Sequence, residues 1–283
     1  MRVAYYFEPW LELGRPYLRY HNFRHQMGPQ IRALVRAGVT VDVFIGDTTW
    51  QKCREDGYQG DGARIHVIAQ QELTEIFPDY CSATVSLARD TASAAQKAAM
   101  GQLLKDKLQG AVPDVFISFL SPVPFVSEMW PETLVLYTEF GLFSRAPYPR
   151  SFYFDRFGLF NQSYLGRYGQ ELRKRPVTAA AIARLNDFRL RTQAPLVASA
   201  PDKREIGASK FRHTLLLPLQ FSNYFGFDAY CRFKSQFEFL EHALSQIPDD
   251  IGVIVTEHSG WPEVVTEHNR DYLRNRYPNA LLA

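Results

Sequence analysis

The feature that most constrains the fold of this chain is an alternation of short apolar strands and amphipathic helices, which occurs twice. The first run opens with a strand at 2–7, continues with a helix at 23–37 that Gly38 ends, and returns to a β-branched strand at 39–45. A strand, a helix and a second strand in this order form the β-α-β unit of a parallel sheet. Apolar patterns predict the further elements of this run: strands at 65–69, 113–120 and 133–137, and an Ala-rich helix at 84–108.

The same alternation restarts near residue 210. Its predicted elements are strands at 213–220, 251–256 and 280–283, and helices at 233–245 and 264–276. Because 283 residues exceed one average domain, we predict two α/β domains, 1–209 and 210–283. The first includes a basic connecting segment with a helix that begins near Pro176. The second is shorter than an average domain and stops on a strand, so we expect it to be truncated.

Several classes of protein are excluded by motif and composition. The segment between the first strand and the first helix carries Glu8, Arg15, Arg19 and His21, but lacks the G-x-G-x-x-G of a dinucleotide fold. The three cysteines form neither a metal spacing nor a disulfide framework, which favours a reducing compartment. The chain shows no signal peptide and no apolar run of membrane-spanning length. We therefore expect a cytoplasmic protein without a nicotinamide or flavin cofactor.

Charge is unevenly distributed along the chain. The formal net charge is only +2, yet residues 145–212 hold fourteen Lys and Arg residues against five Asp and Glu residues. Such a basic segment could face a phosphate-bearing ligand or an anionic membrane surface, or could be a solvated helix face. No zinc-finger, RNP-type or basic-zipper pattern is present, so we expect no nucleic-acid partner.

Polar residues follow the apolar strands at several places. In the first domain, Glu139 and Gly141 end the strand that begins near residue 133, and Arg145 and Asp155 come soon after, on either side of a Pro-containing aromatic run. Because ligands of α/β proteins bind where strands end, we expect these three charged residues to lie in a cleft. The alternatives are a Pro-rich crossover with solvated acids, or a salt bridge between Glu139 and Arg145.

In the second domain, Gln220 ends one predicted strand, and Glu257 and His258 end the next. Asp228 lies between the first of these strands and the following helix. It could be a functional carboxylate, or it could start or cap that helix, a common use of Asp.

These residues resemble motifs of the bacterial retaining β-Kdo transferases of capsule and O-antigen assembly, including the family ninety-nine module. The matching segments are Glu139-Phe140-Gly141 with Arg145 and Asp155-x-x-Gly158, Leu219-Gln220 with Asp228, Glu257-His258, and Tyr6-Phe7-Glu8-Pro9-Trp10 with Arg15 and Arg19. Phe140, Ser259 and the long spacing to Asp228 depart from the family pattern, in which an acid, a proline and a nearer acid are expected. The resemblance implies two Rossmann-like domains facing a cleft, the GT-B plan.

The resemblance also implies roles for the residues. Retention through a covalent intermediate needs a carboxylate nucleophile, which the family pattern places at Asp228, with Asp155 in reserve. Glu139 would be the general base, and His258 would contact the donor phosphate. The remaining donor and substrate contacts would come from Gln220, Glu257, Arg145, Arg15 and Arg19.

No Asp-x-Asp and no ligand-spaced cluster is present, so we expect no metal and no cofactor. A nucleoside-monophosphate donor such as CMP-Kdo fits that expectation. The implied function is transfer of Kdo from CMP-Kdo to a glycan or lipid-linked acceptor in capsule, O-antigen or lipopolysaccharide biosynthesis, with peripheral association at the inner membrane. The alternatives are a GT-B transferase that uses another nucleotide sugar, and a degenerate module that binds glycan or nucleotide.

Overall fold

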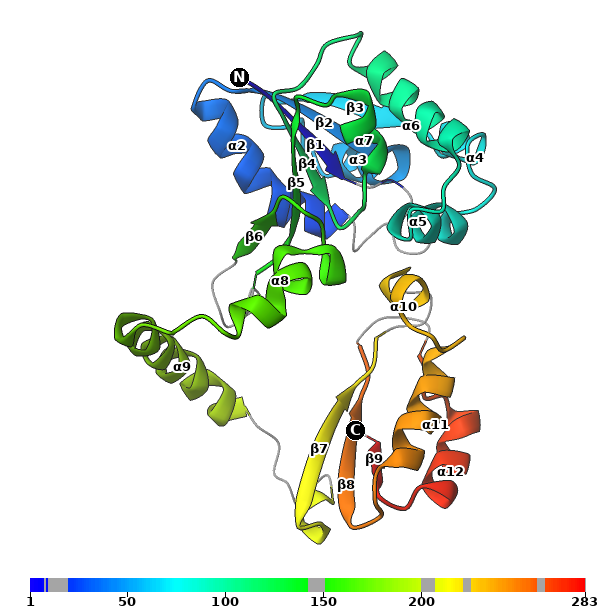
Figure 1. Cartoon of the computed structure of the whole chain (residues 1–283). Coiled ribbons are helices and arrows are strands. Elements are labelled where there is room, and N and C mark those ends of the chain that lie inside the picture. The colour runs from blue at the N-terminus through cyan, green and yellow to red at the C-terminus, as the bar shows by residue number, and fades with distance from the viewer. Residues whose placement is uncertain are drawn as a thin grey trace. The chain divides into compact units, whose positions relative to one another are not determined.

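The computed structural model describes residues 1–7, 9, 20–141, 151–199, 207–220, 225–258 and 263–282. It shows an α/β protein that divides into two compact units, Met1–Ala181 and Ile182–Ala283, with the division inside helix α9 (Figure 1). The domain boundary predicted at 209/210 lies further along the chain, between α9 and β7, and stays a prediction.

The first unit is built on a six-stranded sheet with the order β3-β2-β1-β4-β5-β6. Neighbouring strands from β3 to β5 are parallel, and β6 is antiparallel to β5. The elements of this unit are β1 (Arg2–Phe7), a π-helical turn (Phe23–Met27), α2 (Gly28–Arg36), β2 (Thr40–Gly46), α3 (Asp47–Glu55), β3 (Arg64–Ile68), α4 (Gln70–Thr74), α5 (Tyr80–Ala88), α6 (Ala94–Lys107), β4 (Val115–Phe119), α7 (Pro124–Met129), β5 (Leu134–Phe140), β6 (Phe152–Asp155) and α8 (Tyr164–Leu172).

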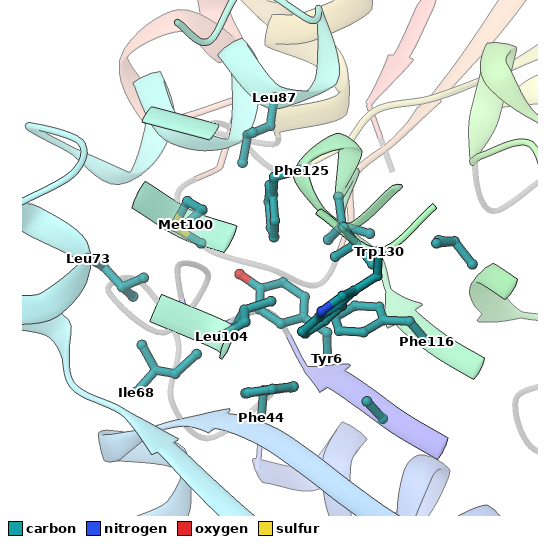
Figure 2. Close-up of a cluster of buried hydrophobic side chains, with 14 of the residues drawn as sticks. Tyr6, Phe44, Ile68, Leu73, Leu87, Met100, Leu104, Phe116, Phe125 and Trp130 are labelled. Carbon is teal, nitrogen blue, oxygen red and sulfur yellow. The ribbon is translucent and has the colours of Figure 1, made fainter. Parts of the chain in front are cut away.

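Two apolar clusters cover the two faces of this sheet. One joins Tyr6, Phe44 and Phe116 of the strands to Met100 and Leu104 of α6 and to residues of α5 and α7 (Figure 2). The other joins alternate residues of the same strands to α2 and α3, and includes Phe7, Ile31 and Cys53. Because successive side chains of a strand point to opposite faces, strands buried on both faces read as nearly continuous apolar runs.

The second unit contains a smaller parallel sheet with the order β7-β8-β9. Its elements are α9 (Ala179–Ser199, shared with the first unit), β7 (His213–Pro218), α10 (Phe225–Tyr230), α11 (Gln236–Gln246), β8 (Ile251–Thr256), α12 (Glu267–Arg276) and β9 (Ala280–Leu282). Helices α11 and α12 pack on one face of the sheet, where Leu240, Val253 and Leu273 are buried together (Figure 1).

The predicted strands are all present, but one predicted helix is wrong. The segment 84–108 forms two helices, because α5 ends at Ala88 and Asp90 adopts a positive φ of 54°. Helix α6 starts again at Ser93, whose hydroxyl accepts from the N–H of Gln96 while the Gln96 side chain bonds back to the N–H of Ser93. This capping box was readable in the sequence as Ser-x-x-Gln.

The prolines of the predicted Pro-containing run lie outside the described residues, but the strands on either side of it are described. Strand β5 extends to Phe140, and β6 returns antiparallel beside it, with Glu139 opposite Tyr153 and Phe140 opposite Phe152. The two strands therefore form a hairpin at the edge of the sheet, and Asp155 is at the end of the returning strand.

Candidate functional site

The carboxyl ends of β1 and β4 mark a topological switch point in the first sheet. Helix α2, between β1 and β2, packs on one face of the sheet, and α7, between β4 and β5, packs on the other (Figure 1). At the end of β4, Leu120 has a φ of 64°, and the Ser118 hydroxyl donates to the Ser121 carbonyl at 2.7 Å. Open α/β sheets bind ligands outside the carboxyl ends of such strands. A ligand site of the first unit is therefore expected at this end of the sheet.

Polar residues that the sequence reasoning missed lie at the same end of the sheet. Asp47 follows β2, and its carboxylate accepts from the N–H of Thr48 at 2.7 Å and from the N–H of Gln70 at 3.2 Å. Gln70 follows β3, and its side-chain amide donates to the carbonyl of Pro9, beyond β1. The signal that could have found these residues is their position just after a predicted strand.

Glu139 and Asp155 share one face of the β5–β6 hairpin. Tyr137 pairs with Asp155 and Glu139 pairs with Tyr153, and paired residues of neighbouring strands point to the same side. Burial raises the pKa of the Tyr153 hydroxyl, and the negative charges of Glu139 and Asp155 raise it further, to about 12. The structure thus places two of the predicted carboxylates and the Tyr153 phenol on one face of the hairpin.

Glu139 is half-buried on this face. One of its carboxylate oxygens accepts a hydrogen bond from the N–H of Phe140 at 2.8 Å. Phe140, which stands where the family pattern has a second acid, points to the opposite face and packs against Phe119 and Phe152. The position therefore carries an aromatic residue that packs on the apolar face of the sheet.

Asp155 is engaged with the backbone through both of its oxygens. One accepts from the N–H of Phe157 and the other from the N–H of Tyr164, each at 2.7 Å. These bonds fix the turn after β6 and the start of α8. The carboxylate therefore has a structural role that accounts for an acid at this position.

Gly141 allows the two strands of the hairpin to lie close together. A Cβ placed on it would lie 2.4 Å from the Ser151 hydroxyl oxygen and 2.9 Å from the Ser151 carbonyl carbon, and the Gly141 N–H donates to the Ser151 carbonyl at 2.8 Å. The returning chain therefore lies so close to Gly141 that a side chain would not fit here.

A groove of about 810 Å³ opens beside Asp155. Its walls come from the end of β6, the following turn and the start of α8, and include Tyr153, Phe154, Arg156, Phe160, Tyr164 and Leu165. The guanidinium groups of Arg156 and Arg167 each lie 5.4 Å from the centre of the Phe157 ring. The chain holds 21 Phe and 15 Tyr residues, and several of them gather around this groove.

In the second unit, Gln220 and His258 lie at matching positions beyond two neighbouring parallel strands. Pro218 of β7 pairs with Thr256 of β8, and each candidate is two residues further along. The N–H of Leu219 donates to the Thr256 carbonyl at 2.8 Å, so the strands stay together to this point. Gln220 is exposed and His258 is half-buried. The carboxyl edge of this sheet thus brings these two predicted residues to one place.

Gln236 also belongs to this edge, and the sequence reasoning missed it. It is the first residue of α11, and its side chain is buried. The side-chain oxygen Oε1 accepts a hydrogen bond from the N–H of Gln220 at 2.8 Å. The signal available in the sequence was the N-cap Ser235 just before it.

Glu257 has a structural role in the loop after β8. One of its oxygens accepts from the N–H groups of Val264 and Val265 at 2.6 and 2.9 Å. These bonds hold the loop after β8, so Glu257 has a structural role that accounts for an acid at this position.

Asp228 lies in the first turn of α10, the short helix between β7 and α11, and its side chain is half-buried. Arg15, Arg19 and Arg145 lie outside the described residues, as does Ser259 after His258.

Within the described residues, no group of three or more His, Cys, Asp or Glu side chains could hold a metal ion. In the same part of the chain, no helix combines the length and the apolar character that a membrane span requires. No model of a known protein family matches the chain, and a search of curated proteins found no match. A function assigned to the chain therefore rests on its own residues.

Proposed function

We propose that this chain is a glycosyltransferase that takes its sugar from a nucleotide donor, held at the carboxyl edge of the second sheet. The observation that carries this proposal is the register of β7 and β8, which brings Gln220 and His258 to equivalent positions. A histidine at such an edge can hydrogen-bond a phosphate and stabilise charge that develops on the leaving group. Gln220 would hydrogen-bond the sugar or nucleotide.

The finer proposal is transfer of Kdo from CMP-Kdo to a glycan or lipid-linked acceptor, with retention of configuration. It rests on the resemblance of the motifs around Glu139, Gln220 and His258. The carboxylate of Asp228 attacks the anomeric carbon and CMP leaves; Glu139 then takes the proton of the acceptor hydroxyl, which attacks the same carbon and releases Asp228. Two Rossmann-like units facing a cleft are part of this proposal.

Nucleotide binding tests the proposal directly. A ligand that binds the folded chain at 100 times its Kd stabilises the chain by about 2.7 kcal/mol, so CMP should raise the melting temperature of the protein, while UDP and GDP should not. His258→Ala should reduce the CMP-induced shift. His213→Ala is the matched control, since His213 is exposed at the amino end of β7 and should leave the shift unchanged.

Stabilisation by UDP or GDP in place of CMP would indicate a transferase with another donor. A CMP shift that survives His258→Ala would contradict the site assigned here. No shift with any nucleotide would contradict the nucleotide-donor proposal.

A binding module without catalytic activity is the second candidate. It is favoured by the engagement of Asp155 and Glu257 with backbone N–H groups, which gives two of the predicted carboxylates structural roles. A chain that binds CMP but releases no CMP from CMP-Kdo with any acceptor would support it.

A further inference from the structure

A set of apolar side chains is exposed around the groove at the end of β6. Leu165 is 71% exposed and Phe154 is 48% exposed, and Tyr164, Phe160 and Tyr153 follow at 39%, 37% and 37%. All five line the groove, Tyr153 and Phe154 from opposite faces of the edge strand β6, and we call them the α8 surface. Single exposed apolar residues are ordinary, but a contiguous group of large ones indicates an interaction site.

Helix α8 is amphipathic, and its apolar side contributes to this surface. Tyr164, Leu165, Tyr168 and Leu172 recur at helical spacing on one side, while Arg167 and Gln170 lie on the other. None of the nine residues of α8 is buried. Most helices of a compact domain bury such a stripe in a core, so this one is available to a partner.

The charges beside the α8 surface are mostly positive. Arg156 lines the groove, Arg167 lies on α8, and the exposed residues Arg173, Lys174 and Arg175 follow the end of α8 directly. The acids nearby are Glu171 and Asp155, and the Asp155 oxygens accept from backbone N–H groups. The partner that complements this surface is therefore both apolar and anionic.

We propose that the α8 surface docks on an anionic lipid bilayer. Leu165 and Phe154 enter the boundary between headgroups and acyl chains, the tyrosines lie at the level of the headgroups, and Arg173, Lys174 and Arg175 contact lipid phosphates. A bilayer fits better than a nucleic acid, because a strongly exposed leucine has no role in phosphate contact. The proposal does not depend on the function proposed above, since docking needs no donor sugar.

Sedimentation of the full chain with lipid vesicles tests this inference. The protein should bind vesicles made of equal parts of phosphatidylcholine and phosphatidylglycerol, should not bind vesicles of phosphatidylcholine alone, and should be released by salt. Replacing Leu165 and Phe154 together by Ser should weaken binding at least about tenfold, because apolar area is then no longer buried in the bilayer. The triple change of Arg173, Lys174 and Arg175 to Gln should weaken it on the order of 100-fold.

Matched control variants distinguish binding through this surface from nonspecific binding to the vesicles. Leu134 and Val112 are also exposed apolar residues of the first unit, at 46% and 56%, and replacing both by Ser should leave binding unchanged. The triple change of the exposed Arg36, Arg54 and Lys105 to Gln is the control for charge. Because the changed side chains are exposed, circular dichroism should show the same fold for all variants.

Equal binding to both kinds of vesicle, or no binding to either, would overturn the proposal, as would an equal loss in the control variants. A concentration-dependent dimer without lipid that the Leu165 and Phe154 changes abolish would assign the surface to a second copy of the chain instead.

Discussion

The buried carboxylate of Asp42 shows how one residue can stabilise an edge of the first sheet. It accepts hydrogen bonds from Arg2 at 2.7 and 3.1 Å, from Arg64 at 3.0 Å, and lies 2.7 Å from the His66 ring. Burial by itself would raise the pKa of Asp42, but the hydrogen bonds from His66 and Arg2 and the positive charges of Arg2 and Arg64 outweigh it. The pKa is lowered from 3.8 to about 2.

A lowered pKa means that the folded state favours the charged carboxylate. The stabilisation is therefore complete above about pH 4 and is lost as the pH falls toward 2. Asp42→Asn should reduce the free energy of unfolding by about 2 kcal/mol at pH 7, and the difference from wild type should shrink below pH 4. Denaturant unfolding at a series of pH values measures this. Asp106→Asn, at an exposed position, is the control, and a difference that does not change with pH would contradict the argument.

The proposed chemistry also makes predictions for single carboxylates. Asp228→Ala should abolish turnover of CMP-Kdo while leaving CMP binding nearly unchanged, because the covalent path is removed. Glu139→Gln should lower kcat by ~100- to 10,000-fold, the usual contribution of general acid-base catalysis. Asp155→Asn should affect stability more than turnover, since Asp155 bonds to the backbone.

Mass spectrometry of the protein trapped with donor provides a second measurement. We expect a Kdo adduct on the peptide that contains Asp228. An adduct on Asp155 would identify Asp155, and not Asp228, as the nucleophile. Full activity of Asp228→Ala without any adduct would exclude the retaining covalent mechanism.

At the scale of elements, the β5–β6 hairpin holds Glu139 and Asp155 on one face. Gly141→Ala would put a methyl group 2.9 Å from backbone of Ser151, which cannot move aside as a flexible side chain does. We expect this change to cost about 1–3 kcal/mol of stability. Gly169→Ala in α8 is the matched control, since its Cβ meets nothing within 4 Å and alanine favours a helix. Thermal unfolding distinguishes them, and equal effects would show that the hairpin has room for a Cβ.

At the scale of the whole molecule, the two units have separate apolar cores. Leu104 belongs to a core of the first unit and Leu240 to the core of the second, and both are fully buried. Domains with separate cores can unfold in separate steps. Leu104→Ala and Leu240→Ala should each cost about 2–5 kcal/mol and each lower a different transition in calorimetry. One transition lowered equally by both changes would show that the units unfold together.

The α/β class, every strand except β6 and the polar residues that follow the strands could be predicted from the sequence alone. The apolar runs at 2–7, 39–45 and 251–256 are local signals. A strand that is buried on both faces is recognised from the apolar side chains of its own segment, without knowledge of its neighbours. Since the carboxyl end of a parallel strand is a defined place, Gln220 and His258 could be proposed from sequence, as could Glu139. The break before Ser93 was equally readable, but the Ala-rich composition on either side favoured one long helix.

The order of the strands, the antiparallel return of β6 and the hydrogen-bond partners of each carboxylate could be known only from the folded chain. They depend on contacts that no local sequence pattern specifies. Asp42 is held by Arg2 and Arg64, Asp155 is bound to the start of α8, and Glu257 is bound to backbone seven and eight residues later. A sequence pattern can place an acid at the end of a strand, but only folding determines whether its oxygens meet a ligand or the N–H groups of its own chain.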